Sequence, residues 1–200
     1  MTKKLKDKEI SYNKPGKNRM RELIIDFINK NDINSILTLE SSEFIFSKGI
    51  PNKKVIVFEN NNETHKRMDK RKPKNVSLFL GDISTFASLD SNIDCIYLDF
   101  TSTYQSNQET IYELRKQIKD CKLFIITLFK TFRGKNKPVM NGDYEFDIIN
   151  KLQTLTNVNW KILYGEKYNN NMITIIMENP NKEWKNQTLK DSDANIAVQK

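Results

Sequence analysis

Short apolar runs alternate with amphipathic segments along most of the chain. Seven runs rich in β-branched and aromatic residues predict strands, at residues 35–39, 54–59, 76–80, 94–100, 121–129, 160–164 and 172–177. Apolar residues at helical spacing predict helices between them, at residues 17–30, 42–48, 61–71, 84–89, 107–120 and 144–155. This alternation over short connections predicts βαβ units, with helices on both faces of a mostly parallel sheet.

The end of the chain departs from this alternation. Its last helix is followed by two strands joined by the polar stretch GEKYNNN, and such a connection makes two strands pair antiparallel. We therefore expect an α/β fold, a Rossmann-like three-layer sandwich whose seven-stranded, mostly parallel sheet has an antiparallel last strand. We expect this single domain at residues 17–179, after a flexible basic arm at residues 1–16 and before a polar tail at residues 180–200.

Composition narrows the class of protein. With 200 residues, 38% of them hydrophobic, the chain can bury a core without disulfides or metals. No run approaches the ~18 apolar residues of a membrane span, and the charged N-terminus shows no secretory signal. We therefore expect a cytoplasmic, intracellular protein with no membrane partner. Cys95 and Cys121 lie in apolar runs and are expected to be reduced core thiols, which leaves too few ligands for a zinc site.

The net charge of +8 is concentrated in three blocks. Residues 1–22 hold eight basic and three acidic side chains, residues 66–74 hold six and one, and residues 130–137 hold four and none. Blocks that converge in space form a face that binds polyanions, and this indicates nucleic acid as a partner. The candidate contacts are Lys17, Arg19, Arg67, Arg71 and Arg133. Alternatively, the same blocks only keep the protein soluble.

Acidic and small polar residues follow the first four predicted strands. Ligands of open α/β sheets bind at the carboxyl ends of the strands, so these residues are the candidates for a site. They are Glu40, Ser41 and Ser42 after the first strand, Glu59 and Asn60 after the second, Asp82 and Ile83 after the third, and Asp99 at the end of the fourth. Each carboxylate also has a simpler explanation, because carboxylates cap helices.

This order of elements and acidic residues resembles the class I S-adenosylmethionine-dependent methyltransferases. The resemblance implies that Glu59 and Asn60 lie at the ribose of this cofactor, and Asp82 and Ile83 at its adenine. It places Glu40, with Ser41 and Ser42, near the methionine end. The chain departs from the family in its first loop, which has no glycine where the family has several. A methyltransferase relic that has lost its cofactor would show the same departure.

Two fragments resemble catalytic motifs of that family. Asp99 to Tyr104 is similar to the Asp/Asn-Pro-Pro-Tyr/Phe motif of enzymes that methylate amines of nucleic acids, but it lacks both prolines and is longer. The alternative is that Asp99 caps the next helix and that Tyr104 covers the sheet edge.

The second fragment, Lys130 to Gly134, is similar to the Lys-x-Phe-x-Gly segment of 2′-O-ribose methyltransferases. Those enzymes use a Lys-Asp-Lys-Glu set. The first lysine of the set is matched by Lys17 or Arg19, its aspartate by Asp99 and its second lysine by Lys130. No glutamate clearly matches its last member. Asp99 and Lys130 are therefore the candidate catalytic residues. Alternatively, Lys130 and Arg133 only contact phosphate.

Three functions compete on this basis. The first is a methyltransferase that uses S-adenosylmethionine and acts on RNA or DNA. The second is a catalytically inactive module of the same fold that binds nucleic acid or a protein partner. A nicotinamide-dependent enzyme is disfavoured, because Gly-x-Gly-x-x-Gly does not follow the first strand.

Overall fold

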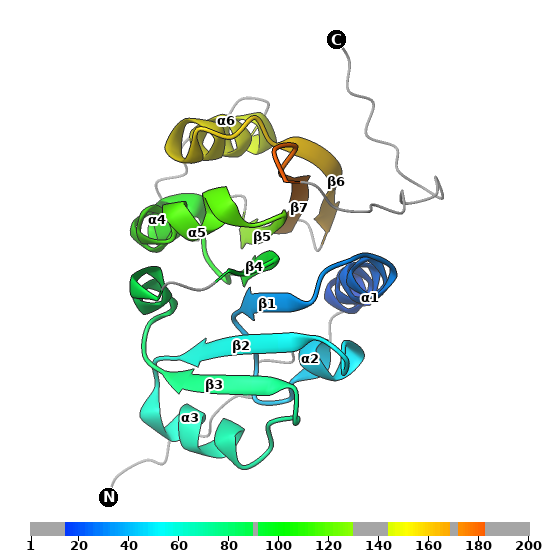
Figure 1. Ribbon diagram of the computed structural model, residues 1–200, viewed down its shortest axis with the longest axis vertical. Helices are drawn as coiled ribbons and strands as arrows, with labels where there is room; N and C mark the ends of the chain where they lie inside the picture. Colours follow the sequence, from blue (N-terminus) through cyan, green and yellow to red (C-terminus); the bar gives the residue numbers. More distant parts are fainter. Residues whose placement is uncertain (1–14, 90–91, 130–143, 169–171, 183–200) are drawn as a thin grey trace, which may run out of the picture.

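The computed structural model describes residues 15–89, 92–129, 144–168 and 172–182. They form one seven-stranded sheet in the order β3-β2-β1-β4-β5-β7-β6 (Figure 1). The strands are β1 (Ser35–Thr38), β2 (Lys54–Glu59), β3 (Val76–Leu80), β4 (Cys95–Asp99), β5 (Leu123–Phe129), β6 (Lys161–Tyr168) and β7 (Met172–Glu178). The first five pair in parallel, and β7 is antiparallel to both β5 and β6. The predicted fold class is confirmed.

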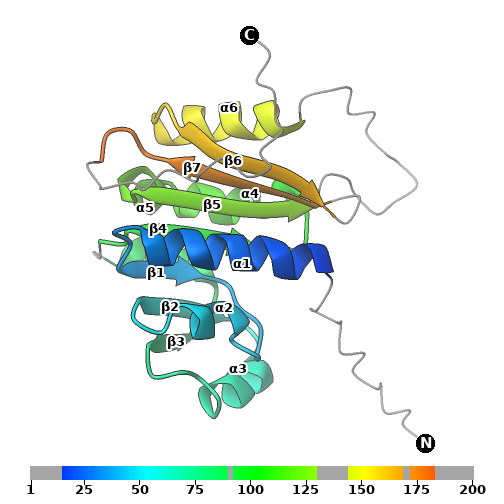
Figure 2. The same cartoon turned by 90° about the vertical axis from the view of Figure 1, so that its right-hand side faces the viewer.

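Helices cover both faces of the sheet and make two cores. The helices are α1 (Pro15–Lys30), α2 (Ile45–Gly49), α3 (Asn62–Asp69), the 3-10 helix η1 (Ile83–Ser88), α4 (Tyr104–Glu113), α5 (Arg115–Asp120) and α6 (Tyr144–Thr156). One core combines apolar residues of α1, α2 and α3 with one face of the sheet, and α1 runs lengthwise along the strands (Figure 2). The other core combines η1, α4, α5 and α6 with the opposite face.

Strand β5 shows why the sheet is closed on both sides. Its residues are buried from Leu123 to Leu128. Alternate side chains serve the two cores, with Ile125 in the α1 core and Phe124 in the α4 core. A central strand with helices on both faces needs such a continuous apolar run.

Several element boundaries differ from the sequence prediction. Helix α1 begins at Pro15, because proline suits the first turn of a helix. The helix predicted at 107–120 is two helices, α4 and α5, which meet at Leu114. Helix α2 starts only at Ile45, because Ser41 and Phe44 close a backbone turn first (N–O 3.0 Å).

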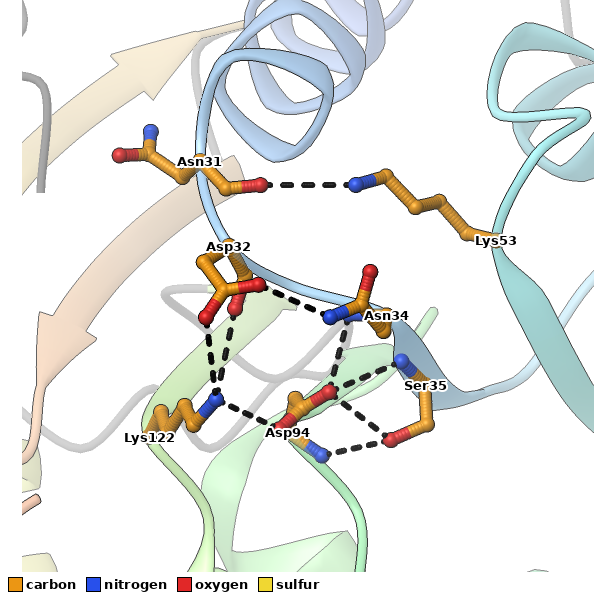
Figure 3. A network of polar contacts seen from close by, with 7 residues as sticks. All are labelled: Asn31, Asp32, Asn34, Ser35, Lys53, Asp94 and Lys122. Carbon is orange, nitrogen blue, oxygen red and sulfur yellow. Dashed lines mark hydrogen bonds and ion pairs between the residues drawn. The ribbon is translucent and has the colours of Figure 1, made fainter. Parts of the chain in front are cut away.

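The amino edge of the sheet is fixed by a polar network around Asp94, directly before β4 (Figure 3). Its Oδ2 accepts hydrogen bonds from the backbone N–H groups of Asn34 (2.9 Å) and Ser35 (3.1 Å) and from the Ser35 hydroxyl. Its Oδ1 lies 3.0 Å from the Lys122 ammonium. Burial would raise the pKa of Asp94, but the bonds from Asn34, Lys122 and Ser35 together lower it.

The two cysteines lie in the core, as the apolar runs around them predict. Cys95 and Cys121 are buried free thiols, and burial raises the pKa of each. In the described part of the chain, every helix is too short or too polar to cross a bilayer.

Candidate functional site

An ion pair joins the end of β4 to the first turn of α1. The Lys17 ammonium lies 2.9 Å from Asp99 Oδ2, and both side chains are about six-sevenths buried, with 15% and 14% of their surface exposed. The other carboxylate oxygen, Asp99 Oδ1, is also buried but has no hydrogen-bond partner among the described residues. Buried polar atoms are nearly always hydrogen-bonded, so an orphan at a strand end indicates a place for a ligand.

The Lys17–Asp99 pair lines a small cavity of about 100 Å³ at the carboxyl edge of the sheet. Arg21, Glu40 and Ser41 also line it. The structure therefore brings two of the three first-loop candidates together with Asp99, whereas Ser42 is not part of this lining. Two cationic and two carboxylate side chains therefore line one cavity. Because the cavity is partly shielded from water, these charges interact more strongly than they would on the surface.

Glu40 is held by helix α2. Its carboxylate accepts hydrogen bonds from the backbone N–H groups of Phe46 (2.8 Å) and Ser47 (3.1 Å) and from the Ser47 hydroxyl. Burial raises the pKa of Glu40, against the lowering effect of Ser47 and of the Arg21 charge. The loop makes this turn without glycine because Phe44, fully buried, adopts a left-handed conformation with φ 50°. The Glu40 carboxylate thus accepts from backbone N–H groups at the start of α2, in a loop that has no glycine.

The candidates of the next two strands lie side by side, outside the cavity lining. Gly81, between β3 and Asp82, donates a 3.0 Å hydrogen bond to the backbone oxygen of Glu59. The Glu59 carboxylate accepts from Asn61 N (2.7 Å), and Asp82 caps η1 through Ser84 N (2.8 Å). The Asp82 bond agrees with the helix-capping explanation, whereas the cap of α3 is Asn61 and not Glu59.

The other two candidates are Asn60, after β2, and Ile83, after β3. Asn60 is exposed, whereas Ile83 is 3% exposed and belongs to the core under η1. A role for any of these residues toward a cofactor stays a prediction.

A row of polar side chains continues from Asp99 across the sheet. Asp99 pairs with Thr127 of β5, Thr127 with Thr174 of β7, and Thr174 with Glu166 of β6. Residues paired in register point to the same face, and the two threonine hydroxyls lie 2.7 Å apart. At the far end of the row, Arg19 lies 2.8 Å from Glu166.

Sequence reasoning missed Glu166. It fell in the stretch taken for a turn, because β6 was predicted to end at Tyr164 but continues to Tyr168. The alternation of Tyr164, Glu166 and Tyr168 was the available signal, since such residues share one face of a strand. The hydroxyl of Tyr164 donates to the Glu166 carboxylate, which reinforces the contact with Arg19.

The stretch from Asp99 to Tyr104 does not place Asp99 as a helix cap. The N-cap of α4 is Thr103, whose side chain accepts from Ser106 N. Asp99 is instead engaged by Lys17, so the capping alternative for Asp99 is wrong. Tyr104 is 3% exposed, with the Lys151 ammonium 5.6 Å from its ring centre. Tyr104 is therefore part of the core between α4 and α6, and its place over the sheet edge stays a prediction.

The basic candidates form two separate groups. Lys17 and Arg19 lie at the carboxyl edge, at the two ends of the polar row. Arg67 and Arg71 are exposed at and beyond the end of α3, and Arg71 lies 3.8 Å from Glu43. The chain then reaches the amino edge, where the Asn75 amide bonds three backbone oxygens, including that of Lys53 before β2. The block at residues 66–74 therefore contacts the first loop through Arg71 and ends near the amino edge of the sheet.

Two further candidates, Lys130 and Arg133, lie outside the described residues. Within the described ranges, no cluster of three or more histidine, cysteine or acidic side chains has the arrangement of a metal site.

No protein-family model matches the chain. No curated protein matches it either.

Solved structures match the fold at low identity. Magnesium protoporphyrin IX methyltransferase from Synechocystis PCC 6803, with bound SAH, superposes with a TM-score of 0.58 at 9% identity, over 82% of this chain and 84% of that one. The N-methyltransferase NodS from Bradyrhizobium japonicum WM9, in complex with S-adenosyl-L-homocysteine, gives 0.54 at 12% identity over 84% and 89%. The Methanococcus jannaschii fibrillarin, a pre-rRNA processing protein, gives 0.52 at 16% identity over 80% and 75%.

These matches establish the architecture. With strand order 3-2-1-4-5-7-6 and an antiparallel β7, the chain has the Rossmann-like fold of class I S-adenosylmethionine-dependent methyltransferases, in a divergent form.

Proposed function

We propose that this protein is an S-adenosylmethionine-dependent methyltransferase that acts on nucleic acid. The observation that carries the proposal is the Lys17–Asp99 pair, whose second carboxylate oxygen is buried without a partner at the carboxyl edge of this fold. When bound, S-adenosylmethionine supplies an electrophilic methyl group. The residues proposed to hold it are Glu40, Ser41, Ser42, Glu59, Asn60, Asp82 and Ile83.

Asp99 and Lys17 are suited to orient an acceptor. Asp99 Oδ1 can accept a hydrogen bond from the attacking group, while Lys17 keeps Oδ2 fixed. Holding the acceptor in line and excluding water is the main task in a displacement reaction. A nearby ammonium stabilises the negative charge that develops on a hydroxyl acceptor, whereas a neutral amine acceptor develops no such charge. The pair therefore favours a hydroxyl as acceptor, and Lys130, directly after β5, is proposed as the second cation.

Glu166 adds a further acidic side chain to the face of the sheet that carries Asp99. It lies on the same sheet face as Asp99, three strands away, with Arg19 against it. Three inter-strand spacings, roughly 14 Å in all, separate Glu166 from Asp99, so it would act on the substrate farther along this face and not on the same hydroxyl. The 2′-hydroxyl of RNA is the acceptor that we propose for Lys17, Asp99 and Lys130.

The nucleic-acid substrate is proposed from charge and from one structural neighbour. The carboxyl edge carries Lys17 and Arg19, and the chain adds further basic residues before α1 and after β5. Fibrillarin, which shares the fold, is described as a pre-rRNA processing protein. Phosphate contacts release counterions, so affinity for a polyanion should fall steeply with salt.

Isothermal titration with S-adenosylmethionine and S-adenosylhomocysteine tests the cofactor. We expect saturable binding of both, and absence of binding at millimolar ligand would overturn the enzyme function. Titration of single-stranded and duplex RNA and DNA between about 50 and 300 mM salt tests the substrate. We expect RNA affinity to fall at least tenfold over this range, whereas a flat response would exclude the basic residues from binding.

The second candidate function is an inactive module that binds nucleic acid. The first loop favours it, since Glu40 is occupied by helix α2 and the loop has no glycine. Salt-dependent RNA binding together with no cofactor binding would select this module.

A further inference from the structure

The two edge strands of the sheet are protected to very different degrees. Strand β3 lies at one edge and β6 at the other (Figure 1). Three of the residues of β6 are charged, and its pairing with β7 shifts register between Ile162 and Tyr164. Charges and irregularities of this kind keep exposed edges from pairing with other chains. The sequence of β3, VSLFL, has no charge and no proline, and it pairs with β2 in continuous register.

The unprotected strand ends in exposed apolar side chains. Phe79 is 44% exposed, Leu80 is 54% exposed, and Leu89, directly after η1, is 45% exposed. The ring of Phe79 stacks on Phe58 with the centroids 5.3 Å apart, on the face of the sheet that η1 covers. Leu80 is the next residue and therefore points to the opposite face, that of α3. Apolar exposure on both faces of an edge strand indicates a docking surface.

The backbone of β3 offers hydrogen bonds along its free edge. Gly81, directly after β3, donates its N–H to the backbone oxygen of Glu59, at the end of β2. Backbone groups of successive residues alternate between the two edges of a strand. Those of Leu78 and Leu80 therefore point away from β2, where an added strand would bond them.

A surplus of positive charge lies beside this edge. Helix α3 packs against β3, and Met68 and Val76 share one core. The helix and the turn after it expose six basic side chains, whereas residues 62–74 contain two acidic ones. Three of the six form ion pairs with carboxylates. The other three, Arg67, Lys70 and Lys74, have no carboxylate within 4.0 Å among the described residues.

These observations restrict the partner. A second copy of the chain would bring two such basic surfaces together, and like charges repel. Nucleic acid suits the charges but has no peptide groups to pair with a strand edge, and Leu80 and Leu89 provide no ring for base stacking. A peptide strand with alternating apolar side chains and flanking carboxylates fits the edge, the leucines and the charges together.

We propose that the free edge of β3 binds an acidic protein segment as an additional strand. Apolar side chains of this segment pack on Phe79 and Leu80, and its carboxylates face Lys70 and Lys74. The surface lies outside the lining of the cavity beside Asp99, so the proposal depends neither on the cofactor nor on the methyl acceptor.

An acetylated peptide of sequence EEVTVTVEE is the probe, and anisotropy of a labelled form gives its affinity. We expect a Kd of about 100 μM or lower, weakened about tenfold or more when lysines replace the glutamates. Methylation of alternate backbone nitrogens of the peptide should weaken binding to the same extent, because it removes the donors that pair with the edge. Amide exchange of Leu78 and Leu80, followed by NMR, should slow about tenfold or more in the complex.

The variants separate the apolar contact from general charge effects. Leu80→Lys should weaken the peptide about tenfold or more, although the added cation attracts it. Ile162→Lys is the matched control, since Ile162 is 42% exposed on the other edge strand, and it should keep the affinity within about threefold. Thermal unfolding of each variant identifies any loss of folding.

The outcomes are distinct from those of the cofactor titration. No saturation of the wild type at about 1 mM peptide would overturn the proposal, even if Leu80→Lys fails to fold. Equal weakening by Ile162→Lys would also overturn it. A dimer of the wild type that Leu80→Lys abolishes would identify a second copy as the occupant instead. Protection of the same amides by RNA and not by the peptide would identify nucleic acid.

Discussion

Two aspartate–lysine pairs lie at opposite ends of the same strand. Asp94 precedes β4 and contacts Lys122 at 3.0 Å, and Asp99 ends β4 and contacts Lys17 at 2.9 Å. Both oxygens of Asp94 are bonded, to two backbone N–H groups, a hydroxyl and an ammonium. Asp99 leaves Oδ1 buried and without a partner among the described residues.

This difference separates a residue that holds the fold together from one that is available for chemistry. A carboxylate with all its acceptors used adds stability and binds nothing more. A carboxylate held through one oxygen is oriented but retains a free acceptor, at some cost in stability. The two aspartates therefore predict opposite consequences when each is replaced.

The largest expected effect is on catalysis by Asp99→Asn. The amide keeps the shape but loses the charge that orients the acceptor, so turnover on RNA should fall by about 10²- to 10⁴-fold. The measurement is single-turnover transfer of a labelled methyl group. Asp94→Asn is the matched control and should keep turnover within about threefold. Normal turnover in Asp99→Asn would remove Asp99 from the reaction.

The next effect is on stability, and it should be larger at Asp94. Asp94→Ala removes charge-assisted hydrogen bonds to Asn34, Ser35 and Lys122, so unfolding free energy should fall by about 2–3 kcal/mol in urea titrations. The paired replacement of Asp99→Ala with Lys17→Met should cost less than about 1 kcal/mol, because it removes the unsatisfied oxygen and leaves no buried charge unpaired. Equal losses would mean that the comparison is wrong.

A pH series sharpens the same contrast. Hydrogen bonds from Asn34 and Lys122 outweigh burial and lower the pKa of Asp94 in the folded protein. Its stabilisation is therefore present above the unfolded value of about 3.9 and is lost as pH falls through the folded value. Between about pH 5 and pH 2, urea midpoints of the wild type should fall more than those of Asp94→Asn. Parallel curves would contradict a lowered pKa at this residue.

The smallest effect expected is that of the amino-edge lysine. Lys122→Met removes one ammonium from Asp94 but leaves its backbone donors, so the expected loss is about 0.5–1.5 kcal/mol by thermal unfolding, with normal turnover. Lys17→Met makes the mirror-image change at Asp99 and should lower turnover about tenfold or more. It should also cost more stability than Lys122→Met, because it leaves the buried Asp99 carboxylate without its counterion. A reversal of this pattern would place the reactive pair at the amino edge.

Much of the fold could be predicted from the sequence because its signals are local. Each of the predicted strands is present, and GEKYNNN gave the antiparallel ending correctly. Boundaries were less predictable: Leu114 interrupts one predicted helix, and β6 runs on through polar residues. There β6 stays extended because it pairs with β7, and the periodicity of the sequence gives no sign of this pairing.

The candidate site was predictable only as an edge of the sheet. Strand direction put Glu40, Glu59, Asp82 and Asp99 at one edge, since parallel strands end together. Which of these carboxylates caps a helix, and which keeps an oxygen free, depends on donors that loop geometry supplies. The position of the block at residues 66–74 likewise depended on the path of the chain after α3.

The sequence by itself determined the order of strands and helices, the antiparallel end of the sheet and the edge where acidic residues gather, because these follow from the spacing of apolar residues and from chain direction. The tertiary structure alone decided that Lys17 pairs with Asp99, that Arg21 lines the same cavity as this pair, and that Glu166 continues the row of polar side chains from Asp99. Those contacts join residues far apart in the chain, and their distances are set by register and helix packing, which no local pattern encodes.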